Sequence, residues 1–338
     1  MRRSGRRYRS GRAAEHYDVI VIGSGIGGLS LAALMTKLGK RVCVLEQHYT
    51  AGGFTHSYER EGFEWDVGVH YIGEVHKPHS TLRRLFDVIS DGALKWAPMD
   101  PVYDRIIIGD RRVDFTAGRG ALADNLIAHF PAEEAAIRRY IELIDEAARS
   151  AQKFFAGQAM PRWLGRTYHA ARPLLVPKNC FRSVRDVLEE LTSNQELIGV
   201  LTGQWGDYGM VPRDASFLMH ATVVKHYFGG GSYPVGGSWM IPETIVPVIR
   251  AGGGEVFTYA KVEEIVIEQG RATGVRMANG DILRADQIVS SAGARVTFEQ
   301  LLPVALRESL GYPAKLKQVK TSGAHLCIYA GFKGSAAE

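Results

Sequence analysis

Six residues near the amino terminus, Gly23 to Gly28, have the spacing G-x-G-x-x-G. In this spacing Gly23 permits a tight turn, Gly25 lets the backbone approach a pyrophosphate, and Gly28 lets a helix pack closely on a strand. A helix that begins at Ile26 adds free N–H groups and the positive end of its dipole. The motif therefore predicts a dinucleotide site formed by Gly23, Gly25, Ile26, Gly27 and Gly28.

A carboxylate and a second glycine pair follow this motif. Glu46 lies 23 residues after Gly23 and directly precedes Gln47, at the predicted end of a second strand. There the carboxylate can accept hydrogen bonds from ribose hydroxyls. Gly52 and Gly53 indicate another close approach of the backbone to the same pyrophosphate. A long cofactor that lies extended along the chain needs this second approach, so the pattern favours FAD; an NAD(P) dehydrogenase is the alternative.

The elements needed to position these residues are also present. Residues 17–22 are typical of a strand buried on both faces, a helical pattern runs over 26–38, and 41–45 predict a second buried strand. Residues 19–36 carry no charge and have the length of a membrane span. Four glycines interrupt that stretch, however, so strand, turn and helix are the better interpretation.

The carboxyl-terminal third predicts a return to the same sheet. Ser238 is in position to cap a helix that reaches Arg250. Short alternating segments separated by turns then predict strands at 255–259, 262–268, 272–277 and 281–284, and a buried strand over 285–293. The expected fold class is α/β, with a Rossmann-like FAD-binding domain that combines a parallel sheet with a β-meander.

Residues 100–228 break the alternation of strands and helices. Strands are expected at 105–108 and 113–115, and helices at 132–155 and 214–228. Ser183 and Asp186 have the spacing of a capping box for a further helix. This pattern predicts an inserted α+β, mostly helical domain that covers the cofactor and holds substrate.

The expected organisation has five parts along the chain. They are a disordered basic tail (1–16), the first segment of the FAD-binding domain (17–100), the substrate or cap domain (101–228), the second FAD-binding segment (229–300), and the start of a second substrate-domain segment (301–338).

The net charge of +5 belongs to the amino terminus. Residues 2–12 contain six arginines and no acid, so the rest of the chain is close to neutral and a nucleic-acid-binding surface is not expected. The three cysteines are far apart, which excludes a disulfide scaffold and favours a reducing, cytoplasmic compartment. No secretory signal follows the arginines.

Other residue patterns identify no catalytic group. The 11 histidines lack metal-ligand spacing, so no metal site is expected, and there is no arrangement typical of a serine hydrolase or of paired carboxylates. His70, His220 and His226 stand out, with a hydrogen-bonding role in the core as the alternative for each. Residues 153–182 are basic and aromatic, which is typical either of a membrane-facing surface or of a solvated helical face.

Several segments resemble one flavoprotein superfamily, that of the phytoene desaturases, carotenoid isomerases and amine oxidases. Within it the chain is most similar to the retinol saturases. The segments that carry this resemblance are Leu45–His48, Gly52-Gly53, Gly62–Gly73, Trp96–Pro98, Tyr208–Pro212, Met219–Ala221, His226-Tyr227, Gly229–Ser238 and Ile245–Gly253.

The resemblance implies FAD as the cofactor and a lipophilic polyene of retinoid or carotenoid type as the substrate. It places His70 near the reactive end of the flavin and the backbone of Val262 against the adenine, with an edge-strand valine as the alternative for Val262. Reduction or desaturation of a carbon–carbon double bond is the implied reaction. A redox-neutral polyene isomerase is the alternative within the enzymes.

Relatives of this kind continue well beyond the segment that corresponds to residues 326–330, which are expected to form a strand. The chain is therefore expected to be truncated at its carboxyl end, and a non-catalytic fragment is the third hypothesis. Peripheral contact with a membrane is compatible with the basic aromatic stretch. The sequence does not indicate the oligomeric state.

Overall fold

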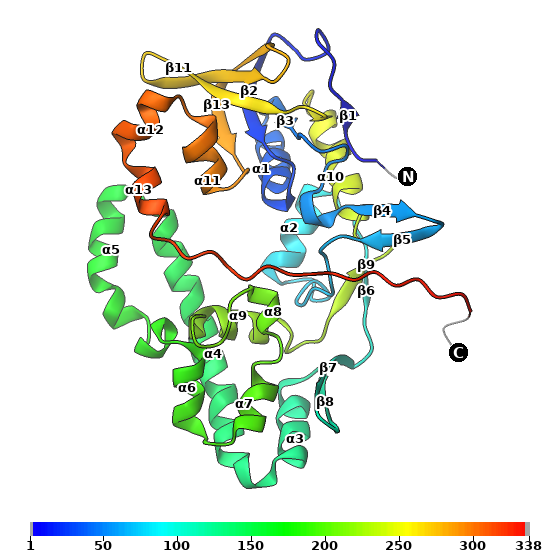
Figure 1. Ribbon diagram of the computed structural model, residues 1–338, viewed down its shortest axis with the longest axis vertical. Helices are drawn as coiled ribbons and strands as arrows, with labels where there is room; N and C mark the ends of the chain where they lie inside the picture. The colour runs from blue at the N-terminus through cyan, green and yellow to red at the C-terminus, as the bar shows by residue number, and fades with distance from the viewer. Residues whose placement is uncertain (1–2, 335–338) are drawn as a thin grey trace.

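A seven-stranded sheet forms the upper part of the molecule in Figure 1. The computed structural model describes residues 3–334, except the side chains at 152, 158, 159, 162, 166, 169 and 172–175. Strand order is β1-β10-β3-β2-β13-β12-β11. The strands are β1 (Arg6–Arg7), β2 (His16–Ile22), β3 (Val42–Leu45), β10 (Glu255–Thr258), β11 (Val262–Glu268), β12 (Arg271–Met277) and β13 (Ile282–Ser290).

The predicted parallel sheet with a β-meander is confirmed. The strands from β1 to β13 in that order run parallel, whereas β13, β12 and β11 are antiparallel neighbours. Val42 to Leu45 are all buried, which explains the uninterrupted apolar sequence of β3. Strands β11 and β12 join through the turn at Gln269-Gly270, where both residues have positive φ.

Three helices cover this sheet: α1 (Ile26–Lys37), α2 (Thr81–Ile89) and α10 (Met240–Ala251). Leu29 of α1 and Ile245 of α10 are fully buried in one core with Val44 of the sheet. The prediction that Ser238 caps α10 is wrong. The helix begins one residue later, after Trp239, and the Ser238 hydroxyl instead donates a hydrogen bond to Asp66 Oδ1 at 2.7 Å.

The chain leaves this part and returns to it through one antiparallel pair, β6 (Trp96–Pro98) with β9 (Ser232–Pro234). A hairpin of β4 (Ser57–Arg60) and β5 (Phe63–Asp66) precedes that pair. Single turns of 3-10 or π helix occur at Gly53–Thr55, Pro131–Glu133, Lys178–Phe181 and Thr297–Leu301.

The insertion between β6 and β9 is mostly helical, as expected. It contains β7 (Val102–Ile108), β8 (Arg111–Thr116), α3 (Arg119–His129), α4 (Glu134–Ala159), α5 (Arg162–Leu175), α6 (Val184–Leu191), α7 (Gln195–Leu201), α8 (Trp205–Tyr208) and α9 (Phe217–His226). It has its own core, in which Ile137, Ile144 and Phe217 are fully buried. The Ser183 cap is confirmed, because its hydroxyl accepts a hydrogen bond from the Asp186 N–H at 3.0 Å.

The amino-terminal segment differs from the disordered tail expected for residues 1–16. Residues 6 and 7 form β1, which extends the sheet by pairing with β10. Tyr8 is buried, and its ring meets the Phe257 ring edge-on at 5.4 Å. The arginine content suggested a solvated tail, but the apolar and hydroxyl side chains between the arginines give this segment a packed face.

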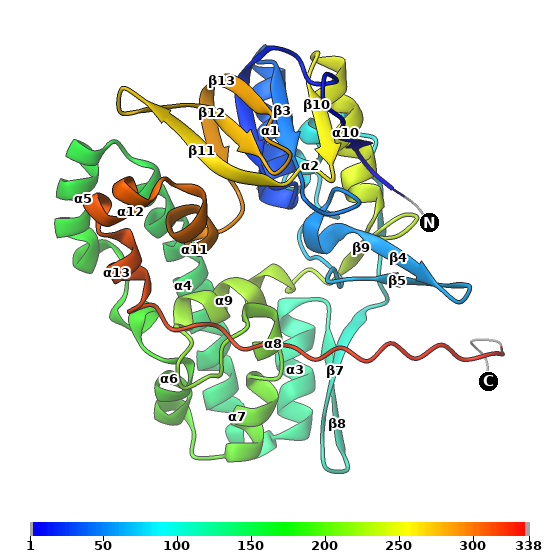
Figure 2. The same ribbon diagram turned by 45° about the horizontal axis from the view of Figure 1, so that its top comes forward.

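The end of the chain also differs from the expectation. After α11 (Ala294–Val296), α12 (Val304–Leu310) and α13 (Tyr312–Leu316), a turn at 317–319 leads into residues 320–334, which form no helix and no strand. Figures 1 and 2 show this segment crossing the molecule between the sheet part and the helical part. The strand predicted over 326–330 is therefore absent. Among residues 3–334 no strand pairs with the backbone of 326–330, and Leu326 is 92% exposed.

No helix among residues 3–334 combines the length and apolar character needed to cross a bilayer. In the basic aromatic stretch, the Trp163 side chain is 74% exposed and Phe155 is 50% exposed. The same predicted surface includes three arginines whose side chains the structure does not describe, Arg162, Arg166 and Arg172.

Candidate functional site: a glycine crossing and a cleft beside it

The two glycine motifs meet in space. Gly25 and Gly52 form an isolated parallel bridge, and the Gly52 N–H donates to the Ser24 carbonyl at 3.1 Å. A Cβ added to Gly53 would lie 2.9 Å from Gly25 Cα, so only glycine allows this approach. The fold thus places two bare stretches of backbone at one point, as a bound pyrophosphate requires.

The glycines of the first motif have different surroundings. A Cβ on Gly28 would lie 2.2 Å from the Gly23 carbonyl oxygen, whereas a Cβ on Gly25 would meet no protein atom within 4 Å. Gly23 has φ of +95°, a region that favours glycine. Gly28 is therefore required by the packing of α1 on β2. Gly25 faces open space, and a Cβ on the exposed Gly27 would have an ordinary contact with Ser291 Oγ at 3.7 Å.

Glu46 lies at the end of β3 and faces the glycine turn. Its Oε2 accepts hydrogen bonds from the Ser24 N–H at 2.9 Å and the Ser24 hydroxyl at 2.7 Å, and its Oε1 accepts from the His48 N–H at 2.8 Å. A cleft of about 220 Å³ opens beside Glu46, His48 and Gly53. The donors, the carboxylate and this space fit the ribose and pyrophosphate of a dinucleotide.

The remaining predicted cofactor residues lie at different distances from this crossing. Gln47 is exposed next to Glu46. The strand that begins at Val262 starts close by, since the Ala260 N–H donates to the Glu46 carbonyl at 2.7 Å. The Val262 side chain is buried in the core under the sheet, so its backbone is the part that a ligand can reach. Cofactor contact by these residues stays a prediction.

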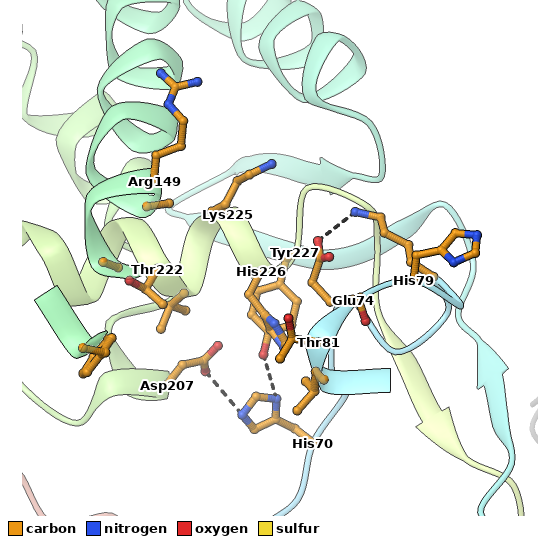
Figure 3. Close-up of a pocket in the computed structure, with 17 residues that line it drawn as sticks. His70, Glu74, His79, Thr81, Arg149, Asp207, Thr222, Lys225, His226 and Tyr227 are labelled. Carbon is orange, nitrogen blue, oxygen red and sulfur yellow. Dashed lines mark hydrogen bonds and ion pairs between the residues drawn. The ribbon is translucent and has the colours of Figure 1, made fainter. Parts of the chain in front are cut away.

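A second, larger cleft of about 880 Å³ lies between the sheet part and the insertion, and Figure 3 shows the residues around it. One wall comes from residues 70–82 and the other from α4, α8 and α9 with the residue that follows α9. Apolar side chains in the lining include Leu82, Phe155 and Val223. The lining also carries charged side chains, among them Glu74, Arg149 and Lys225, so a cleft of this size suits a ligand that has an apolar body and a polar group.

His70 lies in this cleft, between Asp207 of α8 and Tyr227 at the end of α9 (Figure 3). Its Nε2 is 3.7 Å from Asp207 Oδ1, and its Nδ1 is 3.5 Å from the Tyr227 hydroxyl oxygen. The His70 side chain is 51% exposed and that of Asp207 is 22% exposed. Burial raises the pKa of the Asp207 carboxyl, and the nearby His70 opposes that shift. Burial also raises the pKa of Tyr227 strongly, so its hydroxyl stays protonated.

Sequence reasoning selected His70 but missed Asp207 and Tyr227. The three residues are far apart along the chain, and no motif connects them. The only local signal is that each is a polar or titratable residue in a segment rich in glycine and aromatic residues. The insertion has to dock onto the sheet part before the three groups meet.

Of the other two histidines, His220 lies in the core, and the half-buried His226 lines the same cleft. His226 Nε2 accepts a hydrogen bond from the Gly73 N–H at 2.7 Å, and burial lowers the pKa of His226. His220 is fully buried, with Nε2 at 2.9 Å from the Tyr140 hydroxyl and Nδ1 at 3.3 Å from the Tyr208 hydroxyl. Within residues 3–334 there is no cluster of three or more His, Cys, Asp or Glu that could hold a metal ion.

Burial of His220 predicts a pH-dependent stability. Desolvation lowers its folded pKa from 6.5 to about 3, so below about pH 6.5 the unfolded chain binds a proton that the folded chain excludes. We expect the free energy of unfolding to fall by up to about 1.4 kcal/mol per pH unit from this group between pH 6.5 and 3. Denaturant titrations of the wild type and His220→Gln measure it: the variant should have the shallower pH dependence, and equal slopes would contradict this assignment.

Comparisons with known proteins agree with this geometry. Residues 21–89 match the family model of the NAD(P)-binding Rossmann-like domain. The fold resembles that of an oxidoreductase from Methanosarcina mazei (18% identity, TM-score 0.62, covering 89% of this chain and 65% of that one). It also resembles putrescine oxidase bound to putrescine (18% identity, TM-score 0.57, covering 85% and 60%).

Curated relatives are more similar in sequence. The chain is 37% identical to the all-trans-retinol 13,14-reductase of Danio rerio and 35% identical to that of Homo sapiens, in each case over 97% of this chain and 56% of the relative. It is 28% identical to prolycopene isomerase 2 of an Oncidium hybrid cultivar, over 86% of this chain and 51% of the relative. The chain thus spans about half the length of the curated relatives that it matches. Over that shared span, and on a Rossmann-like dinucleotide-binding fold, it is a homologue of the all-trans-retinol 13,14-reductases.

Proposed function

We propose that this chain carries the cofactor site and part of the substrate site of an FAD-dependent oxidoreductase that reduces a carbon–carbon double bond of a retinoid-type polyene. The crossing of the two glycine loops beside Glu46 is the observation that carries the proposal. The identity of 35–37% to retinol 13,14-reductases supports the substrate class and the direction of the reaction.

The preference for FAD over a nicotinamide dinucleotide rests on the second loop. Gly52 and Gly53 have φ of +121° and +57°, and both are held against the first glycine turn. This brings a second stretch of backbone to the position of the pyrophosphate, which suits a cofactor that extends from Glu46 toward the insertion. Gly23, Gly25, Gly27 and Glu46 would hold its ADP half.

When bound, the flavin supplies the hydride equivalent that reduction of a double bond requires. The second carbon of that bond must receive a proton from the protein or from water. In the cleft, His70 is the group best placed to provide it, because a ring N–H can donate a proton and half of this side chain is accessible. Asp207 stabilises the charged ring, and the Tyr227 hydroxyl orients it from the other side.

The lining of the cleft fits an extended apolar substrate. Leu82 and Val223 lie on opposite walls, and Phe155 belongs to the α4 side. These side chains would bind a polyene by burial of apolar surface and would keep water away from the reacting bond. His70, Asp207 and Tyr227 form one polar group in the lining, and charged side chains, among them Glu74, Arg149 and Lys225, line other parts of the cleft.

The decisive experiment combines cofactor retention with product analysis. The purified protein should be yellow, with flavin absorbance, and after anaerobic chemical reduction it should convert a retinoid polyene to a product heavier by two hydrogens. A product of unchanged mass would favour the isomerase, the alternative that the similarity to prolycopene isomerases supports. A colourless protein that takes up no added FAD would favour the non-catalytic hypothesis.

Gly25→Ala tests where the cofactor lies. Gly25 has φ of −60° and ψ of 169°, which alanine adopts without strain, and no protein atom lies within 4 Å of the added Cβ. We therefore expect a normal melting temperature but at least a tenfold loss of FAD affinity, measured by equilibrium binding to the apoprotein. Unchanged affinity would mean that the pyrophosphate does not pass over Gly25.

Peripheral contact with a membrane is a further part of the proposal. The exposed rings of Phe155 and Trp163 belong to α4 and α5, and Phe155 also lines the substrate cleft. Aromatic groups of this kind insert into a bilayer interface, where a polyene substrate is dissolved. Sedimentation of the protein with anionic vesicles would support this contact, and its absence at low salt would contradict it.

A further inference from the structure

Residues 3–8 make specific contacts with the loop that carries the second glycine pair. The Ser4 N–H donates a hydrogen bond to Thr50 Oγ1 at 3.0 Å, and the Ala51 N–H donates to the Ser4 carbonyl at 2.9 Å. Ser4, Thr50 and Ala51 are all buried. The backbone of Ser4, 46 residues before Thr50 in the sequence, is therefore hydrogen-bonded to both residues that directly precede Gly52.

The same segment is anchored on three sides. The Ser4 hydroxyl donates to Glu243 Oε2 of α10 at 2.7 Å. Strand β1 pairs with β10, and the Tyr8 N–H donates to the Thr258 carbonyl at 2.9 Å. The Tyr8 hydroxyl donates to Asp281 Oδ2 at 2.7 Å. These anchors come from α10, from β10 and from Asp281 just before β13, so they tie Ser4 and Tyr8 to the sheet part rather than to the loop.

Within the loop itself, the local order comes from the turn after Gly52, in which the Thr55 N–H and hydroxyl donate to the Gly52 carbonyl at 3.0 and 2.8 Å. Two successive glycines lose more conformational freedom on ordering than any other pair of residues. On its other side the loop is held by Ser24, whose carbonyl and hydroxyl both accept from the Gly52 N–H, at 3.1 and 3.2 Å. The loop therefore lies between the first glycine turn and residues 3–8.

We propose that residues 3–8 are a positioning segment of the dinucleotide site, which holds the Gly52-Gly53 loop against the first glycine turn before the cofactor arrives. This proposal depends on the proposed function in one respect, the identity of the cofactor as FAD. Pre-ordering removes an entropic cost from binding. Release of the segment should therefore weaken FAD binding about tenfold, because the two hydrogen bonds at Ser4 are worth roughly a factor of three each.

Gly5→Val is the variant that displaces the segment. Gly5 has φ of +96°, and its added Cβ would lie 2.8 Å from Thr258 Cγ2 and 3.3 Å from the Val256 carbonyl oxygen. Gly11→Val is the matched control, since Gly11 has φ of +76° but no atom within 4 Å of its Cβ. Thr50→Val is a second variant, which removes the acceptor of the Ser4 N–H and keeps the side-chain volume.

Three measurements on the full chain decide the matter: FAD affinity of the apoprotein, hydrogen exchange at the Ala51 amide, and the rate of tryptic cleavage at Arg6 and Arg7. We expect Gly5→Val to cleave faster, to lose protection at Ala51 and to bind FAD about tenfold more weakly. Thr50→Val should weaken FAD binding by a smaller factor, and Gly11→Val should match the wild type in all three.

Faster cleavage in Gly5→Val with unchanged protection at Ala51 and unchanged FAD affinity would overturn the proposal. If the wild type binds no FAD, the proposed cofactor fails separately. Exchange at Ala51 then still decides whether the segment orders the loop, with loss of protection in Gly5→Val supporting it and wild-type protection contradicting it. If Gly5→Val fails to fold, the same comparison is made between Thr50→Val and the wild type.

Discussion

Gly28→Ala is expected to destabilise the protein by about 3 kcal/mol and to abolish cofactor retention. The added Cβ would lie 2.2 Å from the Gly23 carbonyl oxygen and 3.3 Å from Ser291 Cβ. The first of these is a backbone atom, so the clash is relieved only if α1 moves away from the turn after β2. That movement opens the core around Leu29 and Val21 and separates the two glycine motifs. Denaturant unfolding and the flavin content of the purified variant measure both effects.

Gly27→Ala is the matched control for Gly28→Ala. It adds the same methyl group in the same helical turn, but the nearest protein atom, Ser291 Oγ, is 3.7 Å from the new Cβ. The control should unfold within about 0.5 kcal/mol of the wild type. If both variants unfold at the same denaturant concentration, the close packing of Gly28 is not what holds α1 on the sheet.

His70→Gln is expected to reduce the rate of double-bond reduction by about 100-fold while leaving flavin content unchanged. Glutamine keeps a polar side chain in the cleft but cannot carry a proton to carbon. Asp207→Asn should lose less activity, because the imidazole remains and only its negative partner, 3.7 Å away, is removed. Single-turnover reduction of the polyene by the reduced protein measures the rate, and the visible spectrum measures the cofactor.

His79→Gln is the control for His70→Gln, since His79 lines the same cleft and is exposed. It should react at the wild-type rate. In deuterated water the product of the wild type should acquire two deuterium atoms, because the hydrogen that a reduced flavin transfers also exchanges with solvent. The rate deficit of His70→Gln should shrink when a small exogenous acid is added. Loss of flavin from His70→Gln would instead assign this residue to cofactor binding and contradict the proton role.

The local sequence was sufficient to predict the strands and turns of the Rossmann-like sheet part. The apolar runs of β2 and β3, the glycines between β2 and α1, and the turns at Gln269 and Asn279 each specify a structure through their immediate neighbours. Backbone geometry explains two of the glycines in the motif: Gly28 lets α1 pack against the turn after β2, and Gly25 leaves the space above the backbone open. For the same reason the hairpin of β7 with β8 and the Ser183 cap were predictable.

Predictions of local structure failed where a residue far away in the sequence supplied, or did not supply, the hydrogen-bond partner. Ser238 has the type and position of a helix cap, but Asp66 lies within hydrogen-bond distance and accepts its hydroxyl instead. Residues 326–330 have the composition of a strand, but a strand forms only where a neighbouring backbone is available. The arginines near the amino terminus indicated a solvated tail, whereas Ser4 and Tyr8 between them find partners on the sheet and on α10.

The sequence by itself predicted the strand that begins near residue 17, the glycine turn and helix after it, and the carboxylate at the end of the next strand, because these features depend on contacts within a few tens of residues. Only the tertiary structure decided that His70 meets Asp207 and Tyr227 in one cleft, and that Ser4 brackets the second glycine loop. Those contacts join residues 46 to 157 positions apart. They form only after the insertion and the amino-terminal segment have docked on the sheet, which no local pattern encodes.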